Sequence, residues 1–334
     1  MGRALTAAVL GFACVFATSA RANDSTAEIA LGGLTFTKSD AISMDSEDLY
    51  ISRDRVRVKY RFTNTTNAPI DALVAFPLPE IPPGTIEDET IYWGDPVSGL
   101  KFTTSVDGQP LALQLVEQAF FKGRDIGARL SSLRIPLNRF SESFDAAINR
   151  LPKAERGQLL SDGLIRDNGV SDHPIWMGLW SLCTTLTRQQ TFPARKTVPV
   201  EHEYTPMAGG SVGGGLDPQL RTQAELRADF ITKRRKYCID DNWLVSFDRK
   251  LRSQTKEEAP RYSEVWLGYV LKTGANWKGP IGDFRLVIDK GNPDSLVSFC
   301  AEGVTKISAT QFEVRHTNFT PTNDLDILII DWAR

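Results

Sequence analysis

The sequence has few of the residues that build metal or catalytic centres. It contains four cysteines and three histidines in 334 residues. No two cysteines lie two to four residues apart, so the ligand spacing of a zinc ribbon is absent. The histidines, His173, His202 and His316, are not paired at the spacing of metal ligands either. We therefore predict no metal and no cofactor.

Long apolar runs and an excess of charge are also lacking. After the first 22 residues, no segment approaches the roughly 20 apolar residues that span a bilayer, so we expect no membrane span in the mature chain. The net charge of −2 offers no positive surface for nucleic acid. Apolar residues make up 41% and charged residues 24%, which excludes disorder and collagen. The length suits about two domains.

The first 22 residues have the pattern of a secretory signal peptide. Arg3 supplies a positive start, residues 4–17 are apolar, and residues 20–22 (ARA) form a small-x-small cleavage site. We predict cleavage after Ala22 and export to the periplasm or the extracellular space.

The first half of the remaining chain has the pattern of strands. Val56, Val58, Tyr60 and Phe62 alternate with basic residues. This period of two is typical of a strand with one solvent-exposed face. Asp107-Gly108 stands between two alternating segments, which is a strong hairpin signal. The second half returns to short strands, and the middle contains helical periodicities. The fold class we predict is mainly β with helical insertions, in two antiparallel β-sandwich-like domains.

The predicted domain organisation follows from these patterns. Asp217-Pro218 combines a capping residue with a first-turn proline, which indicates an inserted helix. The expected divisions are a signal peptide (1–22), an N-terminal β-sandwich-like domain (23–135), a helical linker (136–172) and a C-terminal β-rich domain (173–334) with the inserted helix (217–236).

One catalytic pattern occurs in the glycine-rich segment 208–215. Gly209, Ser211 and Gly213 satisfy G-x-S-x-G, the nucleophile elbow of α/β hydrolases. That elbow requires a strand, a strained turn and a helix directly behind the serine. The glycines that follow Ser211 instead predict a mobile loop, and they delay the helix to Pro218. A serine hydrolase is therefore an alternative, and we predict no catalytic residue.

Acidic turns leave a third alternative. Acidic residues are grouped at Asp45/Glu47/Asp48, Asp240/Asp241 and Asp324/Asp326, and a hard cation binds several oxygen ligands. These turns do not follow the spacing of an EF-hand, but a cation-stabilised structural protein remains an alternative. We predict no metal ligand.

The cysteines allow one disulfide in the exported chain. Cys14 leaves with the signal peptide, and Cys183, Cys238 and Cys300 remain. Cys238 and Cys300 both flank strand-like sequence, whereas Cys183 follows an apolar stretch. We predict that Cys238 pairs with Cys300 and that Cys183 is a buried free thiol.

The chain resembles the bacterial family called domain of unknown function 4424. The resemblance rests on blocks along most of the mature chain: residues 23–25, 31–34, 44–51 (MDSEDLYI), 74–79 (VAFPLP), 192–194, 202–206, 237–238, 274–284 (GANWKGPIGDF), 297–300 and 324–330. It implies a secreted bacterial protein and no particular activity. The block at 76–79 is also similar to one in the VIT domain of inter-alpha-trypsin inhibitor, which would imply a β-sandwich.

The function that these observations favour is not enzymatic. Export, sandwich-like strands and the lack of a catalytic constellation indicate an extracytoplasmic binding or interaction module. Its partner would be an envelope protein or a ligand of unknown identity, and not nucleic acid.

Overall fold

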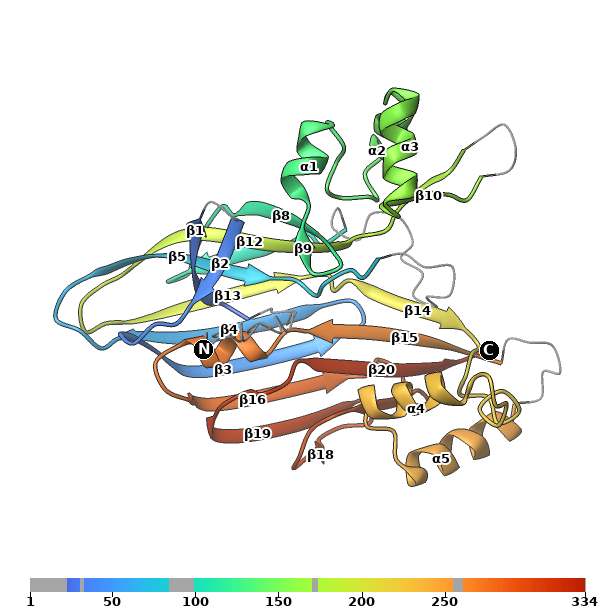
Figure 1. Ribbon diagram of the computed structural model, residues 1–334. Coiled ribbons are helices and arrows are strands. Elements are labelled where there is room, and N and C mark those ends of the chain that lie inside the picture. The colour runs from blue at the N-terminus through green and yellow to red at the C-terminus, as the bar shows by residue number, and fades with distance from the viewer. Residues whose placement is uncertain (1–22, 31–32, 84–98, 170–173, 255–260, 334) are drawn as a thin grey trace, which may run out of the picture.

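A computed structural model describes residues 23–30, 33–83, 99–169, 174–254 and 261–333. The predicted signal peptide, residues 1–22, lies outside the described residues, as does His173. Strands dominate the described chain, as expected, and they form three larger sheets and a two-stranded ribbon. The mainly β class with helical insertions is confirmed (Figure 1).

The largest sheet has eight strands in the order β18-β19-β16-β3-β4-β13-β6-β7. β16 runs parallel to β3, and the other neighbours in this sheet are antiparallel. The strands span β3 (Ile42–Ser52), β4 (Val56–Asn64), β6 (Thr103–Val106), β7 (Gln109–Pro110), β13 (Thr197–Tyr204), β16 (Ile281–Asp289), β18 (Thr305–Lys306) and β19 (Gln311–Phe319).

The second sheet has six strands in the order β2-β1-β5-β12-β8-β9. Their bounds are β1 (Ser25–Ala30), β2 (Gly33–Thr37), β5 (Ile70–Pro77), β8 (Gln114–Phe121), β9 (Arg124–Asp125) and β12 (Ser181–Phe192). The third sheet has the order β14-β15-β20-β17, with β14 (Ala208–Val212), β15 (Tyr262–Tyr269), β17 (Leu296–Phe299) and β20 (Leu325–Trp332). β10 (Ile165–Asp167) and β11 (Trp176–Gly178) pair separately.

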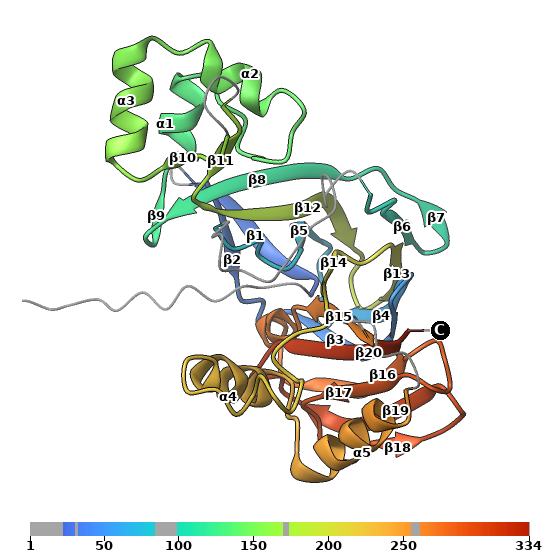
Figure 2. The ribbon, with the colours of Figure 1, turned by 90° about the vertical axis from the view of Figure 1, so that its right-hand side faces the viewer.

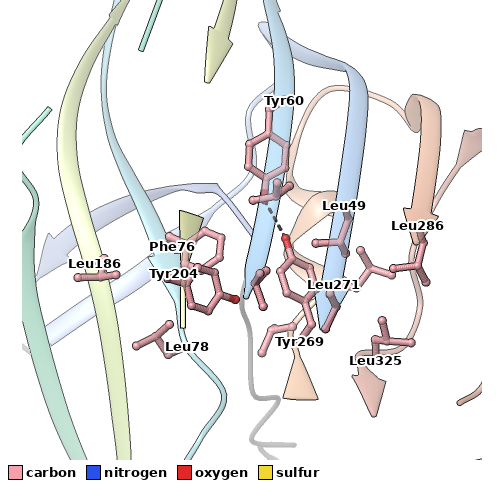
Figure 3. Close-up of a cluster of buried hydrophobic side chains, with 14 of the residues drawn as sticks. Leu49, Tyr60, Phe76, Leu78, Leu186, Tyr204, Tyr269, Leu271, Leu286 and Leu325 are labelled. Atoms are coloured by element: carbon pink, nitrogen blue, oxygen red, sulfur yellow. Dashed lines mark hydrogen bonds between the residues drawn. The ribbon is translucent and has the colours of Figure 1, made fainter. Parts of the chain in front are cut away.

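One hydrophobic core joins the three larger sheets. Phe76 and Leu186 reach it from the six-stranded sheet, Leu49 and Leu286 from the eight-stranded sheet, and Tyr269 from the third (Figure 3). Alternation along each strand determines which side chains enter this core, because successive residues point to opposite faces. Truncating one such side chain to alanine typically costs about 2–5 kcal/mol.

β20 is buried on both of its faces. Ile327 and Ile329 belong to the main core, while Leu328 and Ile330 pack in a second cluster with Phe247 of helix α5 (Asp241–Arg252). A strand that is covered on both faces becomes a continuous apolar run rather than an alternating one. The run 327–330 (ILII) therefore marks the layer between the main core and the helices.

The helices cover the two ends of the sheet assembly. α1 (Gly127–Ser132), α2 (Phe144–Asn149) and α3 (Lys153–Ser161) stand beside β10 and β11, while α4 (Arg227–Lys236) and α5 (Asp241–Arg252) lie at the opposite end (Figure 2). Around the first group, Phe144, Ile148 and Leu159 pack with the buried Trp180. A 3-10 helix, η1 (Lys272–Asn276), follows β15.

The helix expected over 217–236 is shorter and begins at Arg227. Residues 217–226 form turns instead, because the Asp217 side chain accepts a hydrogen bond from the Gln219 N–H (2.9 Å) and Arg261 pairs with Asp217 (3.1 Å). Such local bonds compete with helix formation.

The expected division at 135 and 172 remains a prediction, but strands from both sides of it share sheets. β13 pairs with β4, β16 pairs with β3, and β12 lies between β5 and β8.

The predicted disulfide is present between Cys238 and Cys300, with Cα atoms 5.1 Å apart. It joins the chain just after α4 to the chain just after β17. Cys183 is free, as predicted, but it is half-buried rather than buried.

Candidate functional site

A cavity of about 500 Å³ lies against the six-stranded sheet. Ser181, Cys183 and Thr185 line it from β12, and Gln118 and Phe120 line it from β8. These residues share one face, because Ser181 is paired with Phe120 and Cys183 with Gln118. Leu182 and Leu186, on the other face of β12, belong to the main core. The cavity is therefore on the face of the sheet that turns away from the core.

Apolar side chains form much of the cavity wall. Leu34 and Phe36 come from β2, Pro83 follows β5, and Phe120 and Leu179 contribute from the middle of the chain. Cavities of this size with apolar walls and a few polar groups are typical of small-molecule sites.

Two local features of the backbone position segments that line the cavity. β5 ends at Pro77, and the prolines that follow cannot donate to a sheet ladder. The chain is nevertheless held beside β12, because Ile81 and Leu182 exchange backbone hydrogen bonds of 3.0 and 2.9 Å. At the other side, Lys122 and Gly123 adopt positive φ angles of 50° and 75° in the turn between β8 and β9, which glycine tolerates without strain.

Several polar side chains that line the cavity have no partner in the described part of the chain. Glu80, Gln118, Ser181 and Thr185 make no side-chain hydrogen bond or ion pair within the described parts of the chain. Thr184 also lines the cavity, but along β12 its side chain alternates to the face of Leu182 and Leu186, so its buried hydroxyl, unpartnered among the described residues, is on the core side. Buried polar groups are usually hydrogen-bonded, so unpaired ones around a cavity are suited to contact a ligand or water.

The Cys183 thiol is not set up as a nucleophile. Burial, reinforced by the charges of Glu80 and Asp125, raises the pKa of Cys183 to about 12. The reactive species of cysteine is the thiolate, so at neutral pH Cys183 acts as a small, weakly polar wall of the cavity.

A second polar cluster lies inside the core, around Asp24. Arg188 donates to both carboxylate oxygens of Asp24 at 3.1 and 2.7 Å, and His202 Nε2 lies 3.1 Å from the same carboxylate. Thr104 Oγ1 is 2.9 Å from His202 Nδ1. Burial opposes the charge of Asp24, but Arg188 and then His202 hold its pKa well below the ordinary value. We call Asp24, Arg188, His202 and Thr104 the Asp24 cluster.

The Asp24 cluster has the hydroxyl–imidazole–carboxylate order of a catalytic triad but not its access. Asp24 and His202 are 0% exposed. Burial lowers the pKa of His202, so the imidazole is neutral at pH 7. A neutral ring satisfies both neighbours when Nε2 donates to Asp24 and Nδ1 accepts the Thr104 hydroxyl. The cluster therefore serves to stabilise the interior.

Asn23 extends this cluster into a second set of buried bonds. Its amide donates to Glu47 (3.0 Å) and accepts from Tyr60. The Tyr60 and Tyr269 hydroxyls are 3.0 Å apart (Figure 3), and Tyr269 donates to Glu47 at 3.3 Å. Burial raises the pKa of Glu47 to about 8, so Glu47 is largely protonated at pH 7. Thr273 Oγ1 also donates to the Asn23 carbonyl (2.7 Å).

The segment 208–215, expected to be a mobile loop, contains β14 instead. Its glycines permit a close approach to β15, since a Cβ at Gly210 would meet the Glu264 carbonyl oxygen at 2.5 Å. The Ser211 hydroxyl donates to the Gly213 carbonyl at 2.8 Å. His202 is bonded within the Asp24 cluster, and His316 stacks on Phe284 and Phe319. Neither of these two histidines is hydrogen-bonded to Ser211.

The acidic turns are used in local structure. Asp240 caps α5 by accepting from the Trp243 N–H (2.6 Å), and Asp324 accepts from the Leu271 and Lys272 N–H groups at 3.1 Å. In the part of the chain that the structure describes, no three His, Cys, Asp or Glu side chains are grouped to hold a metal ion. None of the described helices has the length and apolar character to cross a lipid bilayer.

The fold and the cavity define a β-rich, sandwich-like protein with a small-molecule-sized pocket on an outer sheet face. The chain belongs to the family described as domain of unknown function DUF4424, which its sequence matches over residues 22–328. No match was found among curated proteins.

Among the solved structures to which the chain is similar is a Legionella pneumophila subsp. pneumophila str. Philadelphia 1 protein that is provisionally named a nutrient binding protein. The two are 14% identical, with a TM-score of 0.43, over 92% of this chain and 70% of that chain.

Proposed function

We propose that the protein is a non-enzymatic binding module that takes a small, largely apolar molecule into the cavity of the six-stranded sheet. The observation that carries this proposal is the cavity itself. It is large enough for a small ligand, and Glu80, Gln118, Ser181 and Thr185 in its lining have no side-chain partner within the described chain. A ligand that fills it would remove apolar wall from water, at about 25 cal/mol per Å².

The proposal places the protein outside the cytoplasm. The signal-peptide pattern of residues 1–22 and the Cys238–Cys300 disulfide support this location, because disulfides persist in oxidising compartments. The match to the family begins at residue 22, where the predicted signal peptide ends. Mass spectrometry of protein from the native envelope should find Asn23 at the N-terminus; an intact residue 1 would contradict the proposed export.

A fluorescent probe tests the binding function. N-phenyl-1-naphthylamine is neutral, apolar and bright only in an apolar site, so the protein should bind it saturably. Ser181→Phe places a ring on the cavity face of β12 and should abolish the signal. Val245→Phe adds the same ring on α5, where Val245 is 53% exposed, and should leave binding unchanged. Equal binding by both folded variants would contradict the proposal.

A further inference from the structure

The charged groups around the cavity differ in where they can act. Glu80 is half-buried and Lys122 is exposed, and both line the cavity. Glu80 makes no hydrogen bond or ion pair to any residue that the structure describes. A half-buried carboxylate without a partner loses part of its hydration and gains nothing in return within the protein.

Lys122 is directed toward a different neighbour. Its Nζ lies 4.9 Å from the centre of the Phe121 ring. Phe121 also lines the cavity, and it packs against the helical cluster that contains Trp180. The ammonium is therefore held by the ring of Phe121, whereas Glu80 has no such partner in the described chain.

The charges that act on the Cys183 thiol are both negative. Burial is the main reason why its pKa is raised, and the negative charges of Glu80 and then Asp125 add to that effect. Both charges stabilise the protonated thiol, so they make the electrostatic potential at Cys183 more negative. A ligand carboxylate placed here would meet like charge, while a cation would meet opposite charge.

We propose that the cavity selects a ligand with an apolar body and a cationic group, such as an alkylammonium, that pairs with Glu80; this inference rests on the proposed function. The carboxylate accepts charge-assisted hydrogen bonds from the ammonium. The aromatic residue Phe120 lines the same cavity, and the face of an aromatic ring attracts a cation. The apolar walls bind the rest of the ligand.

Competition between three ligands of equal chain length tests the selectivity. Dodecylammonium, dodecanol and dodecanoate, each kept below its micelle concentration, displace N-phenyl-1-naphthylamine from the full-length protein. We expect the ammonium to displace the dye at about tenfold lower concentration than the alcohol, as one charge-assisted hydrogen bond allows, and the carboxylate to be the weakest.

Two variants locate the effect. Glu80→Gln keeps the size of the side chain and should bring the ammonium and the alcohol to within about twofold of each other, while dye binding persists. Glu155→Gln removes an exposed carboxylate on α3 that does not line the cavity, and should retain the wild-type order. Equal loss of preference in both variants would overturn the role of Glu80.

The outcomes separate this inference from the function on which it rests. A folded protein that does not bind the dye contradicts the binding function itself. Saturable dye binding with equal displacement by the three ligands, or with dodecanoate as the strongest competitor, leaves the binding function intact and overturns the selectivity for cations.

Discussion

Two groups of polar side chains, the Asp24 cluster and the polar lining of the cavity, differ in their hydrogen bonding. In the Asp24 cluster, the guanidinium and the imidazole are both hydrogen-bonded to the carboxylate, and all three groups are almost fully buried. At the cavity, Glu80 and Gln118 have no hydrogen-bond partner in the described chain and are half-buried. Because an unpaired buried polar group costs free energy, the first arrangement stabilises the fold and the second keeps groups available for a ligand.

The Asp24 cluster and the cavity lining should also respond differently to mutation. Removing one member of a paired buried cluster leaves its partner without compensation, so the fold loses stability. Removing an unpaired polar group at the cavity takes away no bond, so stability should stay constant while binding changes. Stability and dye binding, measured on the same variants, therefore distinguish the two regions.

The largest effect should come from the Asp24 cluster. Asp24→Ala leaves Arg188, which is 3% exposed, without its counter-charge and should lower the free energy of unfolding by about 3–5 kcal/mol. Urea denaturation followed by tryptophan fluorescence measures it. A variant as stable as the wild type would show that the cluster does not hold the fold.

The disulfide should have the next largest effect, without changing either polar region. Replacing Cys238 and Cys300 together by serine should destabilise the protein by about 2–4 kcal/mol, because the bridge closes a loop of 62 residues. Dye binding should be unchanged in the folded variant. Thiol counting on the denatured, unreduced wild type should find one free thiol, that of Cys183; three would contradict the pairing.

Glu47 gives the stability a pH dependence. Its pKa is raised from 4.5 to about 8, so between these values the folded state retains a proton that the unfolded state has lost. Stability is then full below pH 4.5 and falls as the pH rises through 8. From pH 6 to pH 8, the wild type should lose about 2 kcal/mol relative to Glu47→Gln.

Comparing the wild type with Glu47→Gln removes the contribution of His202 to the pH dependence of stability. Burial lowers the pKa of His202, so His202 makes stability rise with pH through 6.5, opposite in sign to Glu47. His202 is present in both proteins, and its contribution cancels in their difference. Parallel pH profiles for the two proteins would show that Glu47 is not protonated in the fold.

The sequence predicted the local features of this fold because their causes are local. The alternation at Val56–Phe62 reappears as the buried face of β4, and Asp107-Gly108 turns between β6 and β7 with φ angles of 51° and 74°. The Cys238–Cys300 pairing followed from an odd cysteine count and strand-flanking positions. In each case, a few neighbouring residues carry the signal.

Neither polar region could be predicted, because both depend on contacts between distant segments. Asp24 and Arg188 are 164 positions apart, and only the pairing of β1, β5 and β12 brings their strands together. The cavity takes its walls from residues 34–36, 77–83, 118–123 and 179–185. The three glycines that follow Ser211 led to the prediction of a mobile loop. Ser211 instead lies in β14, where Gly210 fits closely against the Glu264 carbonyl of β15.

Two buried tyrosines sharpen the comparison with a smaller effect. Tyr60→Phe removes a hydroxyl bonded to Asn23 and Tyr269, and it should cost about 1–2 kcal/mol. Tyr204→Phe removes a buried hydroxyl that has no partner in the described chain, so stability should be unchanged or slightly higher. Thermal melts of both variants measure the difference. Equal destabilisation would mean that pairing does not determine the cost.

The smallest effect on stability should come from Gln118→Leu at the cavity. The Gln118 amide makes no hydrogen bond to the described chain, and its neighbour across the strand is Cys183. The change should alter the free energy of unfolding by less than about 0.5 kcal/mol. It should also tighten dye binding about two- to threefold, because the added apolar wall contributes a fraction of 1 kcal/mol. A loss of more than about 1 kcal/mol would mean that Gln118 is bonded as tightly as the Asp24 cluster. The distinction between the hydrogen-bonded Asp24 cluster and the unbonded polar side chains of the cavity would then not hold for Gln118.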